Sequence, residues 1–461
     1  MVRFLSLNEL SIPWVYSMGR LFGTAGIRKV YPEGVDPILA YKLGLVVSEI
    51  IGNNGTAYIV HDTRITSPTL SLAIMSGFMA GGLEAGYIGL APTPVAAYAS
   101  LWHGVVGVSV TASHNPPEYN GFKLVREESR PISKITGIER IKKLVLANTS
   151  FLPNKKKGNV IKKNVLDDYS KFVFEGIQIK KIKPLRIVVD TANGVVGIVI
   201  SQIFKKLPVQ LYHLFPELDG RFPNHLPNPL VEENLEDIKQ TVRKKKADLG
   251  VAFDGDGDRI IFVDEKGEVV PPDLIGVLVA ESVLKRYPGQ KIMYDIRSSN
   301  IVKEKIKEAG GVAIMSRVGH SFIKERMRKE NIVFAQEFSG HYYFKDRYFA
   351  ESPFFVLFKI LERLSESKKK LSDIIKEYKK YYHSGEINFE VADKEKKIKE
   401  LEKKFSKGKK TYLDGLRVDF KDWWFNVRPS NTEPLLRLVI EAKTKEVLEK
   451  KKKEISALIK K

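Results

Sequence analysis

Short runs rich in valine and isoleucine alternate with longer amphipathic segments through about residue 365, and this alternation restricts the possible folds more than any other feature. Continuous apolar runs of roughly four to eight residues are typical of buried strands, whereas a period near 3.6 residues indicates helices that cover a sheet. The pattern therefore predicts repeated strand–helix–strand units and an α/β fold. The expected strands are 57–61, 104–110, 185–189, 248–253, 291–294 and 331–335. The expected helices are 36–52, 67–85, 235–245, 273–286 and 299–309.

The last ninety residues or so follow a different pattern. Short strand-like segments occur at 385–391, 415–420, 422–427 and 435–442, and a lysine-rich helix ends the chain. This predicts a small α+β domain with a mainly antiparallel sheet. Because 461 residues are too many for one hydrophobic core, the whole chain is expected to form about three or four domains.

The composition is that of an ordinary globular protein, with 43% hydrophobic and 28% charged residues. No membrane span is expected, because the chain has no run of about 18 apolar residues, and its first residues do not resemble a signal peptide. Cysteine is absent from the sequence, which excludes disulfides and thiolate metal ligands. A cytoplasmic location is therefore expected.

The formal net charge of +21 raises the question of a nucleic-acid partner. Several of the lysine runs alternate with glutamate, as in 395–401, and such runs are typical of solvated helix faces. Zinc-finger and aromatic RNA-binding motifs are missing from the sequence. We therefore expect no nucleic-acid binding and attribute the charge to solubility and to the attraction of an anionic substrate. The nucleic-acid alternative predicts binding that weakens steeply with salt.

Residues 254–259 read Asp-Gly-Asp-Gly-Asp-Arg, directly after an expected strand. Asp254, Asp256 and Asp258 repel one another unless a cation lies among them, so the pattern predicts a site for a hard divalent ion with oxygen ligands. An acidic surface turn is the alternative that the local sequence leaves open. An EF-hand loop is disfavoured because Arg259 stands where that loop needs glycine, although Glu265 falls at its twelfth position.

The segment 111–116, Thr-Ala-Ser-His-Asn-Pro, also follows an expected strand. Ser113, with His114 beside it, could act as a nucleophile. The glycines that flank the serine of a hydrolase elbow are missing, and an ordinary turn or a helix cap is the structural alternative. The predicted metal-binding segment 254–259, called the metal loop below, favours the interpretation of Ser113 as a nucleophile. A phosphorylated Ser113 would supply a further oxygen ligand to the ion.

Two further polar loops offer ligand-binding groups. The segment 428–434, Arg-Pro-Ser-Asn-Thr-Glu-Pro, concentrates donors that can surround a phosphate. The segment 337–341, Glu-Phe-Ser-Gly-His, offers a carboxylate and a hydroxyl that can bind sugar hydroxyls. Because ligands collect at the carboxyl ends of strands in open α/β sheets, the four loops predict one shared cleft. Three stretches are expected to run from a strand through a polar loop into a helix: 105–116, 249–259 and 332–341.

These motifs, in this order, resemble those of the α-D-phosphohexomutase family. The resemblance spans about residues 20–440 and also includes the segments 22–28, 120–123, 190–194 and 317–320. It implies a four-domain α/β architecture, in which three related α/β mixed-sheet domains and a C-terminal α+β domain like the TATA-binding protein surround one central cleft. The expected domains are 1–152 with the serine loop, 153–253 ending at the metal loop, 254–368 with the metal and sugar-binding loops, and 369–461 with the phosphate-binding loop.

The resemblance also implies roles for individual residues. A phosphorylated Ser113 would transfer the phosphoryl group, and His320 would be a general acid or base. Mg²⁺ would be held by Ser113, Asp254, Asp256 and Asp258. The implied catalytic residues are Ser113, His114, Lys123, Arg259 and His320. The implied substrate-binding residues are Arg28, Glu337, Ser339, His341, Arg428, Ser430, Asn431, Thr432 and Arg437.

The implied reaction moves a phosphoryl group between O1 and O6 of a hexose phosphate through a hexose 1,6-bisphosphate, which would also be the activator. Histidine at position 320 favours glucose and mannose phosphates, because phosphoglucosamine mutases of this family tend to have aspartate there. A phosphoglucosamine mutase, a catalytically silent sugar-phosphate sensor and a Mg²⁺-dependent phosphatase with an aspartate nucleophile are the alternatives. The expected partners are small-molecule hexose phosphates, and a homodimer is compatible with the resemblance. Gln336 stands where the family commonly has glycine, so a small shift of the sugar loop is expected.

Overall fold

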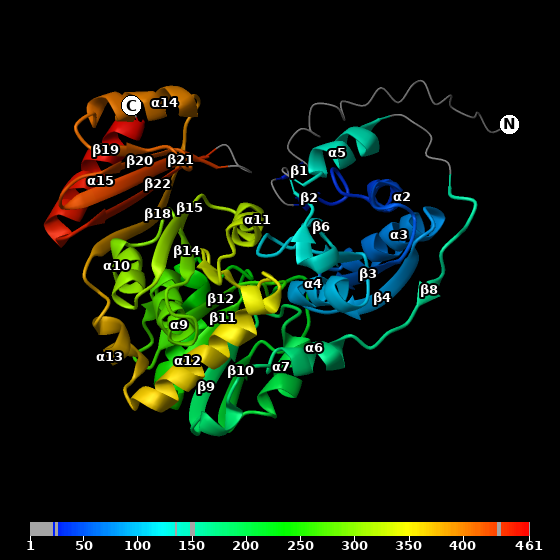
Figure 1. Ribbon diagram of the computed structural model, residues 1–461, viewed down its shortest axis with the longest axis horizontal. Helices are drawn as coiled ribbons and strands as arrows, with labels where there is room; N and C mark the ends of the chain where they lie inside the picture. Colours follow the sequence, from blue (N-terminus) through cyan, green and yellow to red (C-terminus); the bar gives the residue numbers. More distant parts are fainter. Residues whose placement is uncertain (1–21, 24–25, 134–135, 148–152, 431–434, 461) are drawn as a thin grey trace.

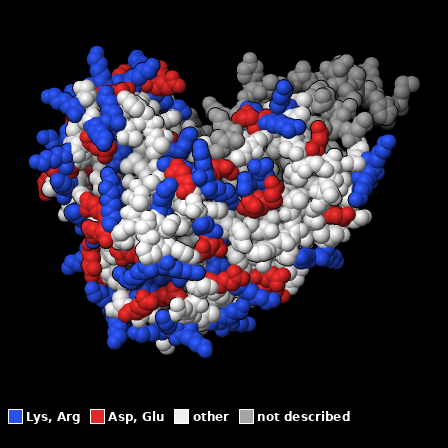
Figure 2. Space-filling model, viewed as in Figure 1, with Lys and Arg blue, Asp and Glu red and all other residues white. Residues whose placement is uncertain are grey.

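The computed structural model describes residues 22–23, 26–133, 136–147, 153–430 and 435–460. Four β-sheets follow one another along the chain (Figure 1). The first and the fourth sheet lie on opposite sides of the molecule, and the second and third sheets lie between and below them. Figure 2 shows the same view in space-filling form.

The first sheet is the largest and has the order β1-β2-β6-β5-β3-β4-β8. Its strands are β1 (Phe22–Gly23), β2 (Gly26–Val30), β3 (Thr56–His61), β4 (Glu84–Leu90), β5 (Val106–Val110), β6 (Tyr119–Arg126), β7 (Arg130–Pro131), which pairs with β6, and β8 (Val160–Ile161). The helices of this part are α2 (Pro37–Ile51), α3 (Ser67–Ala80), α4 (Thr93–Trp102) and α5 (Ile138–Leu146). Helix α2 begins where its sequence predicts, because the Asp36 side chain accepts a hydrogen bond from the Leu39 N–H at 2.7 Å and Pro37 occupies the first turn.

The second and third sheets are smaller. The second has the order β10-β9-β11-β12-β13, and the third has the order β15-β14-β16-β17. The strands of the second sheet are β9 (Leu185–Asp190), β10 (Val209–Leu214), β11 (Leu249–Phe253), β12 (Ile260–Asp264) and β13 (Val269–Val270). Those of the third are β14 (Lys291–Asp295), β15 (Val312–Ser316), β16 (Phe334–Gln336) and β17 (Tyr342–Phe344). The accompanying helices are α6 (Leu166–Phe172), α7 (Gly197–Phe204), α8 (Glu236–Lys245), α9 (Pro272–Arg286), α10 (Asn300–Glu308), α11 (His320–Glu330), α12 (Pro353–Ser367) and α13 (Leu371–Lys376).

One strand order recurs in all three sheets, as β4-β3-β5-β6, β10-β9-β11-β12 and β15-β14-β16-β17. In each set the first three strands are parallel, and the fourth is antiparallel to the third. The expectation of three related α/β domains with mixed sheets is thus confirmed.

The antiparallel fourth strands correct one expectation. The polar loops after β5, β11 and β16 each lead into an antiparallel strand, not into the expected helix. A short loop can turn a strand back beside itself, whereas a parallel crossover needs a dozen or more residues. The loops nevertheless lie at the carboxyl ends of the three strands, where the site was expected.

The fourth sheet, with the order β18-β22-β21-β20-β19, is antiparallel throughout its described pairs, as the sequence predicts. Its strands are β18 (Tyr382–Glu390), β19 (Lys409–Thr411), β20 (Leu416–Asp419), β21 (Trp423–Pro429) and β22 (Leu435–Ala442), and its helices are α14 (Lys394–Lys404) and α15 (Lys445–Lys460). Elsewhere, the expected helix 67–85 ends at Ala80, and its last residues begin β4 instead. The expected strand 331–335 begins only at Phe334, where the chain pairs with β14.

The pairing of strands bears on the domain boundaries. The boundary expected between residues 253 and 254 would separate β11 from β12, its hydrogen-bonded neighbour. We therefore propose that the second domain extends through β13. By the same reasoning the first domain includes β8, which pairs with β4.

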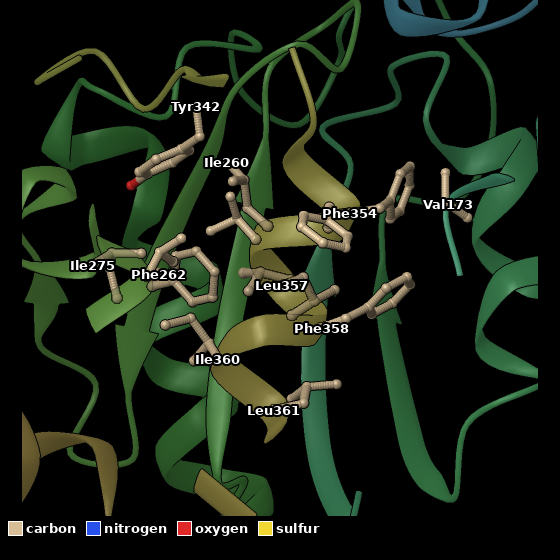
Figure 3. Close-up of a cluster of buried hydrophobic side chains, with 14 of the residues drawn as sticks. Val173, Ile260, Phe262, Ile275, Tyr342, Phe354, Leu357, Phe358, Ile360 and Leu361 are labelled. Carbon is tan, nitrogen blue, oxygen red and sulfur yellow. The ribbon is translucent and has the colours of Figure 1, made fainter. Parts of the chain in front are cut away.

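Helix α12 joins the second and third domains in a common core (Figure 3). It follows the third sheet in the chain, but its Phe354 and Phe358 lie in the cluster that contains Ile260 of β12. The ring of Phe354 is 5.3 Å from that of Phe253, and the ring of Phe358 is 4.7 Å from that of Phe174. Close-packed interiors resist relative movement, so the loops of these two domains are held in a fixed relation to each other.

Basic and acidic side chains are interspersed over the face that Figure 2 shows, as expected for solvated helix faces. Within the described residues, no helix is both long and apolar enough to cross a membrane.

Candidate active site

Ser113 lies in the loop after β5 in a conformation that a side chain rarely adopts. Its φ is 54°, in the left-handed region, and it is fully buried. The Ser113 N–H donates to Thr111 Oγ1 at 2.8 Å, and its carbonyl accepts from Arg64 Nη2 at 2.9 Å. The hydroxyl donates to Asp254 Oδ2 at 2.7 Å. Strained residues persist only where surrounding contacts hold them, and here those contacts direct the serine towards the aspartate loop.

Arg64 holds the whole serine loop, although the sequence did not single it out. Its guanidinium is buried, and its Nε donates to Asp62 Oδ2 at 3.0 Å. That same Asp62 oxygen accepts from the Thr111 hydroxyl at 2.7 Å. The planar fork of an arginine can satisfy several acceptors at once. The carbonyl oxygens that it binds are those of Ser113, Asn115, Pro116 and Tyr119.

The three aspartates of the 254–259 segment form one buried cluster. Carboxylate oxygens of Asp254, Asp256 and Asp258 lie within 4.8 Å of one another. Asp256 Oδ1 is buried and has no hydrogen-bond partner among the described residues, so it remains available to a cation. Gly255 lets the two loops meet, because a Cβ at this position would lie 2.6 Å from the Ser113 carbonyl oxygen. An all-oxygen cluster of this kind fits a hard divalent ion such as Mg²⁺.

Neighbouring side chains orient the cluster and balance its charge. Thr93 Oγ1 donates to Asp256 Oδ2 at 2.6 Å. Lys123 Nζ donates to the same oxygen, also at 2.6 Å, and to Asp258. Lys123 therefore lies against the carboxylates of the aspartate cluster and offsets part of their negative charge. Burial, together with the charges of Asp258 and Asp256, raises the pKa of Asp254 to about 7.

The raised pKa of Asp254 predicts that stabilisation by Mg²⁺ depends on pH. Without metal, the folded protein retains a proton that an unfolded aspartate with a pKa of about 3.9 has lost, so this group's contribution to stability falls as pH rises from about 4 to about 7. Metal binding requires the ionised carboxylate and therefore becomes stronger over the same range. We expect saturating Mg²⁺ to raise Tm more at pH 8 than at pH 6. Equal rises in Tm would contradict this interpretation, and Asp254→Asn should remove the pH dependence.

The structure also places the other residues that the sequence associated with the serine loop. Arg28 on β2 donates from Nη1 to Asn115 Oδ1 at 2.8 Å. His114 Nδ1 lies 3.3 Å from the Ser113 hydroxyl oxygen. Burial, with the positive charges of Arg259, Arg28 and Lys123, lowers the pKa of His114 well below its ordinary value. His114 is therefore neutral near pH 7.

The loop after β16 lies directly beside the metal loop. His341 Nε2 is 3.2 Å from Asp258 Oδ1 and accepts from Arg259 Nε at 3.3 Å, and its Nδ1 is 2.9 Å from Ser339 Oγ. The Glu337 carboxylate is buried and accepts from the Gly319 N–H at 2.9 Å and from the Tyr343 hydroxyl at 2.6 Å. These contacts connect the predicted sugar loop to the 317–320 segment.

Gln336, the residue that departs from the family pattern, points into the core. Its amide lies against Gly276 of α9, where a Cβ would be 1.2 Å from Gln336 Oε1. The absent side chain at Gly276 thus provides the space that the larger residue needs.

Two of the residues that were predicted to bind phosphate, both on the fourth sheet, belong to a cluster of arginines. Arg428 and Arg437 are direct neighbours on adjacent strands, a like-charged pair that is unfavourable unless an anion lies between them. Glu386 of β18 supplies that anion: its carboxylate lies 2.6 Å from Arg428 Nη2 and 3.3 Å from Arg437 Nη1. Arg297, from the third domain, lies 3.5 Å from the same carboxylate. The cluster therefore connects the third and fourth domains.

One donor of Arg428 is left unpaired in this cluster. Its Nε is buried and has no hydrogen-bond partner within the described part of the chain. Ser430 lies at the end of β21, where its N–H donates to the Leu435 carbonyl at 2.8 Å. Asn431 and Thr432 lie outside the described residues.

Several residues that shape the site were not predicted from the sequence. Only Arg64 had a local signal, since Asp62-Thr63-Arg64 follows an expected strand as the other polar loops do. The others are Thr93, Glu386 and Glu351, whose Oε1 lies 3.1 Å from His320 Nδ1, and they meet their partners only through the fold.

Four family models of the phosphoglucomutase/phosphomannomutase family match most of the chain. Alpha/beta/alpha domains I, II and III match residues 19–151, 167–267 and 271–381, and the C-terminal domain matches 386–458. A phosphomannomutase of Methanocaldococcus jannaschii is 39% identical over 95% of this chain and 97% of its own length. A phosphomannomutase/phosphoglucomutase of Pseudomonas syringae is 36% identical over 93% of each chain.

Solved structures agree with the sequence matches. The crystal structure of a phosphoglucomutase/phosphomannomutase family protein from Burkholderia thailandensis has a TM-score of 0.87 and 31% identity, over 96% of this chain and 97% of that one. Together with the serine loop and the aspartate cluster, these matches show that the chain belongs to the phosphoglucomutase/phosphomannomutase family of phosphohexomutases, enzymes of the isomerase class.

Proposed function

We propose that this protein interconverts the 1- and 6-phosphates of mannose and glucose through a phosphorylated Ser113 and a hexose 1,6-bisphosphate. The observation that carries the proposal is the position of Ser113, whose hydroxyl oxygen lies 2.7 Å from a carboxylate of the buried aspartate cluster. A nucleophile beside an all-oxygen metal cluster suits phosphoryl transfer, in which positioning and charge neutralisation provide most of the rate acceleration.

In the first half-reaction, the bond between phosphorus and Ser113 Oγ breaks as a bond to a free sugar hydroxyl oxygen forms. The serine oxygen ends as a hydroxyl, and the sugar oxygen loses its proton. The second half-reaction is the reverse at the other phosphate, which returns to Ser113. Mg²⁺, held by Asp254, Asp256, Asp258 and the serine phosphate, would neutralise charge on the transferring oxygens. Lys123 and Arg259 add positive charge at the same place.

Between the two half-reactions the bisphosphate must turn round, so one binding site must accept either phosphate. Arg428, Ser430 and Arg437 support such a site on the fourth domain, and we place the predicted ligands Asn431 and Thr432 with them. Glu337, Ser339 and His341 would bind sugar hydroxyls, and Arg28 would bind the substrate near the serine loop. The arginine cluster around Glu386 supports this assignment, because one carboxylate leaves positive charge for a phosphate dianion.

The preference for mannose and glucose follows from the named relatives and from histidine at position 320. Glucosamine phosphate is the second candidate substrate. The deciding experiment supplies purified protein with Mg²⁺, a trace of glucose 1,6-bisphosphate as activator and a panel of 1-phosphates of mannose, glucose and glucosamine. We expect 6-phosphate to form fastest from mannose or glucose 1-phosphate. Faster conversion of glucosamine 1-phosphate would overturn the preference, and the absence of any 6-phosphate would overturn the function.

Truncation of Arg428 should weaken binding of the phosphate that is not being transferred. The change Arg428→Ala removes a charge-assisted contact worth about 1.5–3 kcal/mol, so kcat/KM should fall roughly ten- to a hundredfold. Both directions, from glucose 1-phosphate and from glucose 6-phosphate, should be impaired alike, because one site serves both orientations. Lys443→Ala, which removes an exposed cation of the same domain, is the matched control. An unchanged kcat/KM in both directions would place the phosphate site elsewhere.

A further inference from the structure

Glu386 of β18 lies where arginines of two domains converge. Its Oε2 accepts from Arg428 Nη2 at 2.6 Å and lies 3.5 Å from Nη1 of Arg297, in the third domain. Its Oε1 lies 3.3 Å from Arg437 Nη1. Burial opposes ionisation, but the charges of the three arginines outweigh it and hold the pKa of this carboxyl below its ordinary value. Glu386 is therefore an anion near pH 7.

The contact between Glu386 and Arg428 uses only half of what the guanidinium offers. An arginine binds a carboxylate or a phosphate best through two parallel N–H donors, such as Nε and Nη2. Arg297 shows the full arrangement with Asp295, to which its Nε donates at 3.2 Å and its Nη2 at 2.7 Å. Arg428 Nε, by contrast, is buried and has no hydrogen-bond partner in the described part of the chain. A ligand with two suitably spaced oxygens can use both donors of Arg428 and replace Glu386.

The strand that carries Glu386 has local freedom to release this contact. The pairing of β18 with β22 shifts its register between His383 and Glu386, which marks a β-bulge. Gly385, within the bulge, has a φ of 67°, and a Cβ at this position would meet nothing within 4 Å. Bulges redirect the side chains next to them. The carboxylate can therefore move away from Arg428 while its other oxygen stays with Arg437.

We propose that Glu386 is a built-in competitor of the substrate phosphate, which binds Arg428 in the ligand-free protein and releases it when phosphate takes both Nε and Nη2. The inference rests on the proposed mutase function and adds a residue that limits how tightly the phosphate is held. Because each phosphate must first displace Glu386, its apparent affinity is reduced. Weaker binding suits a mutase, since the bisphosphate has to leave the phosphate site and turn round between the two half-reactions.

The test compares ligand affinity in the wild type and in Glu386→Gln by isothermal titration calorimetry, with inorganic phosphate and separately with glucose 6-phosphate. The amide keeps the shape of the side chain but lacks its charge. We expect Kd for both ligands to fall roughly three- to thirtyfold, meaning tighter binding, because phosphate no longer displaces a charge-assisted hydrogen bond. The matched control is Glu400→Gln, which removes an exposed, ion-paired carboxylate of the same domain and should leave both Kd values unchanged.

A double-mutant cycle locates the effect at Arg428. In an Arg428→Ala background, Glu386→Gln should change Kd by less than about twofold, because the donor for which the two anions compete is gone. An equal fall of Kd in both backgrounds would contradict the inference, since it would indicate a general effect of charge.

A stability measurement and a second variant keep the result interpretable if Glu386→Gln is poorly stable. Removal of the carboxylate leaves the arginines closer to unpaired, so Tm without ligand should fall. Saturating inorganic phosphate should then raise Tm more in the variant than in the wild type. Glu386→Asp keeps the charge but shortens the side chain by one methylene, so its Kd should lie between those of the wild type and Glu386→Gln.

Steady-state kinetics test the consequence for turnover. In Glu386→Gln, KM for glucose 1-phosphate should fall together with Kd, and kcat should fall as well, because a bisphosphate that is held more tightly turns round more slowly. A residue that merely supports the arginines would give the opposite change in KM. A lower Kd with an unchanged or higher kcat would refute the claim that competition by Glu386 assists the turn.

The binding measurements need no turnover, so they separate this inference from the proposed function. A wild-type protein without mutase activity, whose Kd for inorganic phosphate nevertheless falls in Glu386→Gln, would overturn the function and leave the competition supported. An active wild-type enzyme whose Kd is unchanged or higher in Glu386→Gln would overturn the inference and leave the function standing.

Discussion

Replacement of Ser113 by alanine is expected to lower mutase turnover by several orders of magnitude, the size typical of losing a nucleophile that acts together with its site. The reason lies in the geometry, because Ser113 is the one described residue whose carbonyl accepts from Arg64 and whose hydroxyl donates to Asp254. Intact mass and peptide mapping after exposure to substrate should locate phosphate on Ser113. Steady-state assays of Ser113→Ala then measure the loss.

The control for this variant is Ser76→Ala on α3, which removes an exposed hydroxyl from the same domain and should leave turnover unchanged. Phosphate found only on other residues would remove Ser113 from the mechanism. Near-normal turnover in Ser113→Ala accompanied by phosphate release would instead favour the phosphatase alternative with an aspartate nucleophile. Ligand binding without turnover in the wild type would favour the sensor.

Loss of the metal ligands is expected to have an effect of similar size. The change Asp256→Asn removes one charge and almost no volume, so the fold should persist while the site loses part of its affinity for Mg²⁺. A bound divalent ion contributes several kcal/mol to the transition state, so turnover should fall roughly a thousandfold or more. Chelation of metal in the wild type should produce a comparable loss, and Mg²⁺ should restore activity best, with Mn²⁺ partly effective.

A control variant and a stability measurement test whether the loss in Asp256→Asn is specific to the metal site. Asp237→Asn on α8 is the matched control, because it removes an exposed carboxylate of the second domain outside the cluster. Thermal unfolding of Asp256→Asn without metal should match the wild type closely or exceed it, since the variant relieves repulsion within the cluster. Full activity in the presence of a chelator would contradict the assignment of residues 254–259 as the metal-binding loop.

Much of the chemistry could be predicted from short stretches of sequence. The spacing of Asp254, Asp256 and Asp258 by single glycines is local, and it predicts a cluster of oxygen ligands wherever the segment lies. Apolar runs predict strands for a similar reason, because the apolar character of each residue indicates that it is buried. The prediction of a helix after each of the serine, metal and sugar loops was wrong, because an antiparallel strand follows each loop. A short apolar run has the same appearance whether it begins a helix or an antiparallel strand, and the pairing partner decides.

The sequence by itself determined which groups are present: a serine after one strand, three aspartates after another, and an arginine-containing loop near the end. The tertiary structure alone decided what holds them, because the supporting contacts join residues far apart in the chain. Arg64 binds the carbonyl of Ser113, 49 positions away, and Glu386 binds Arg428, 42 positions away. Glu351 reaches His320 across 31 positions. Local patterns record that a side chain is buried or charged, whereas the identity of its partner depends on how the sheets and helices pack.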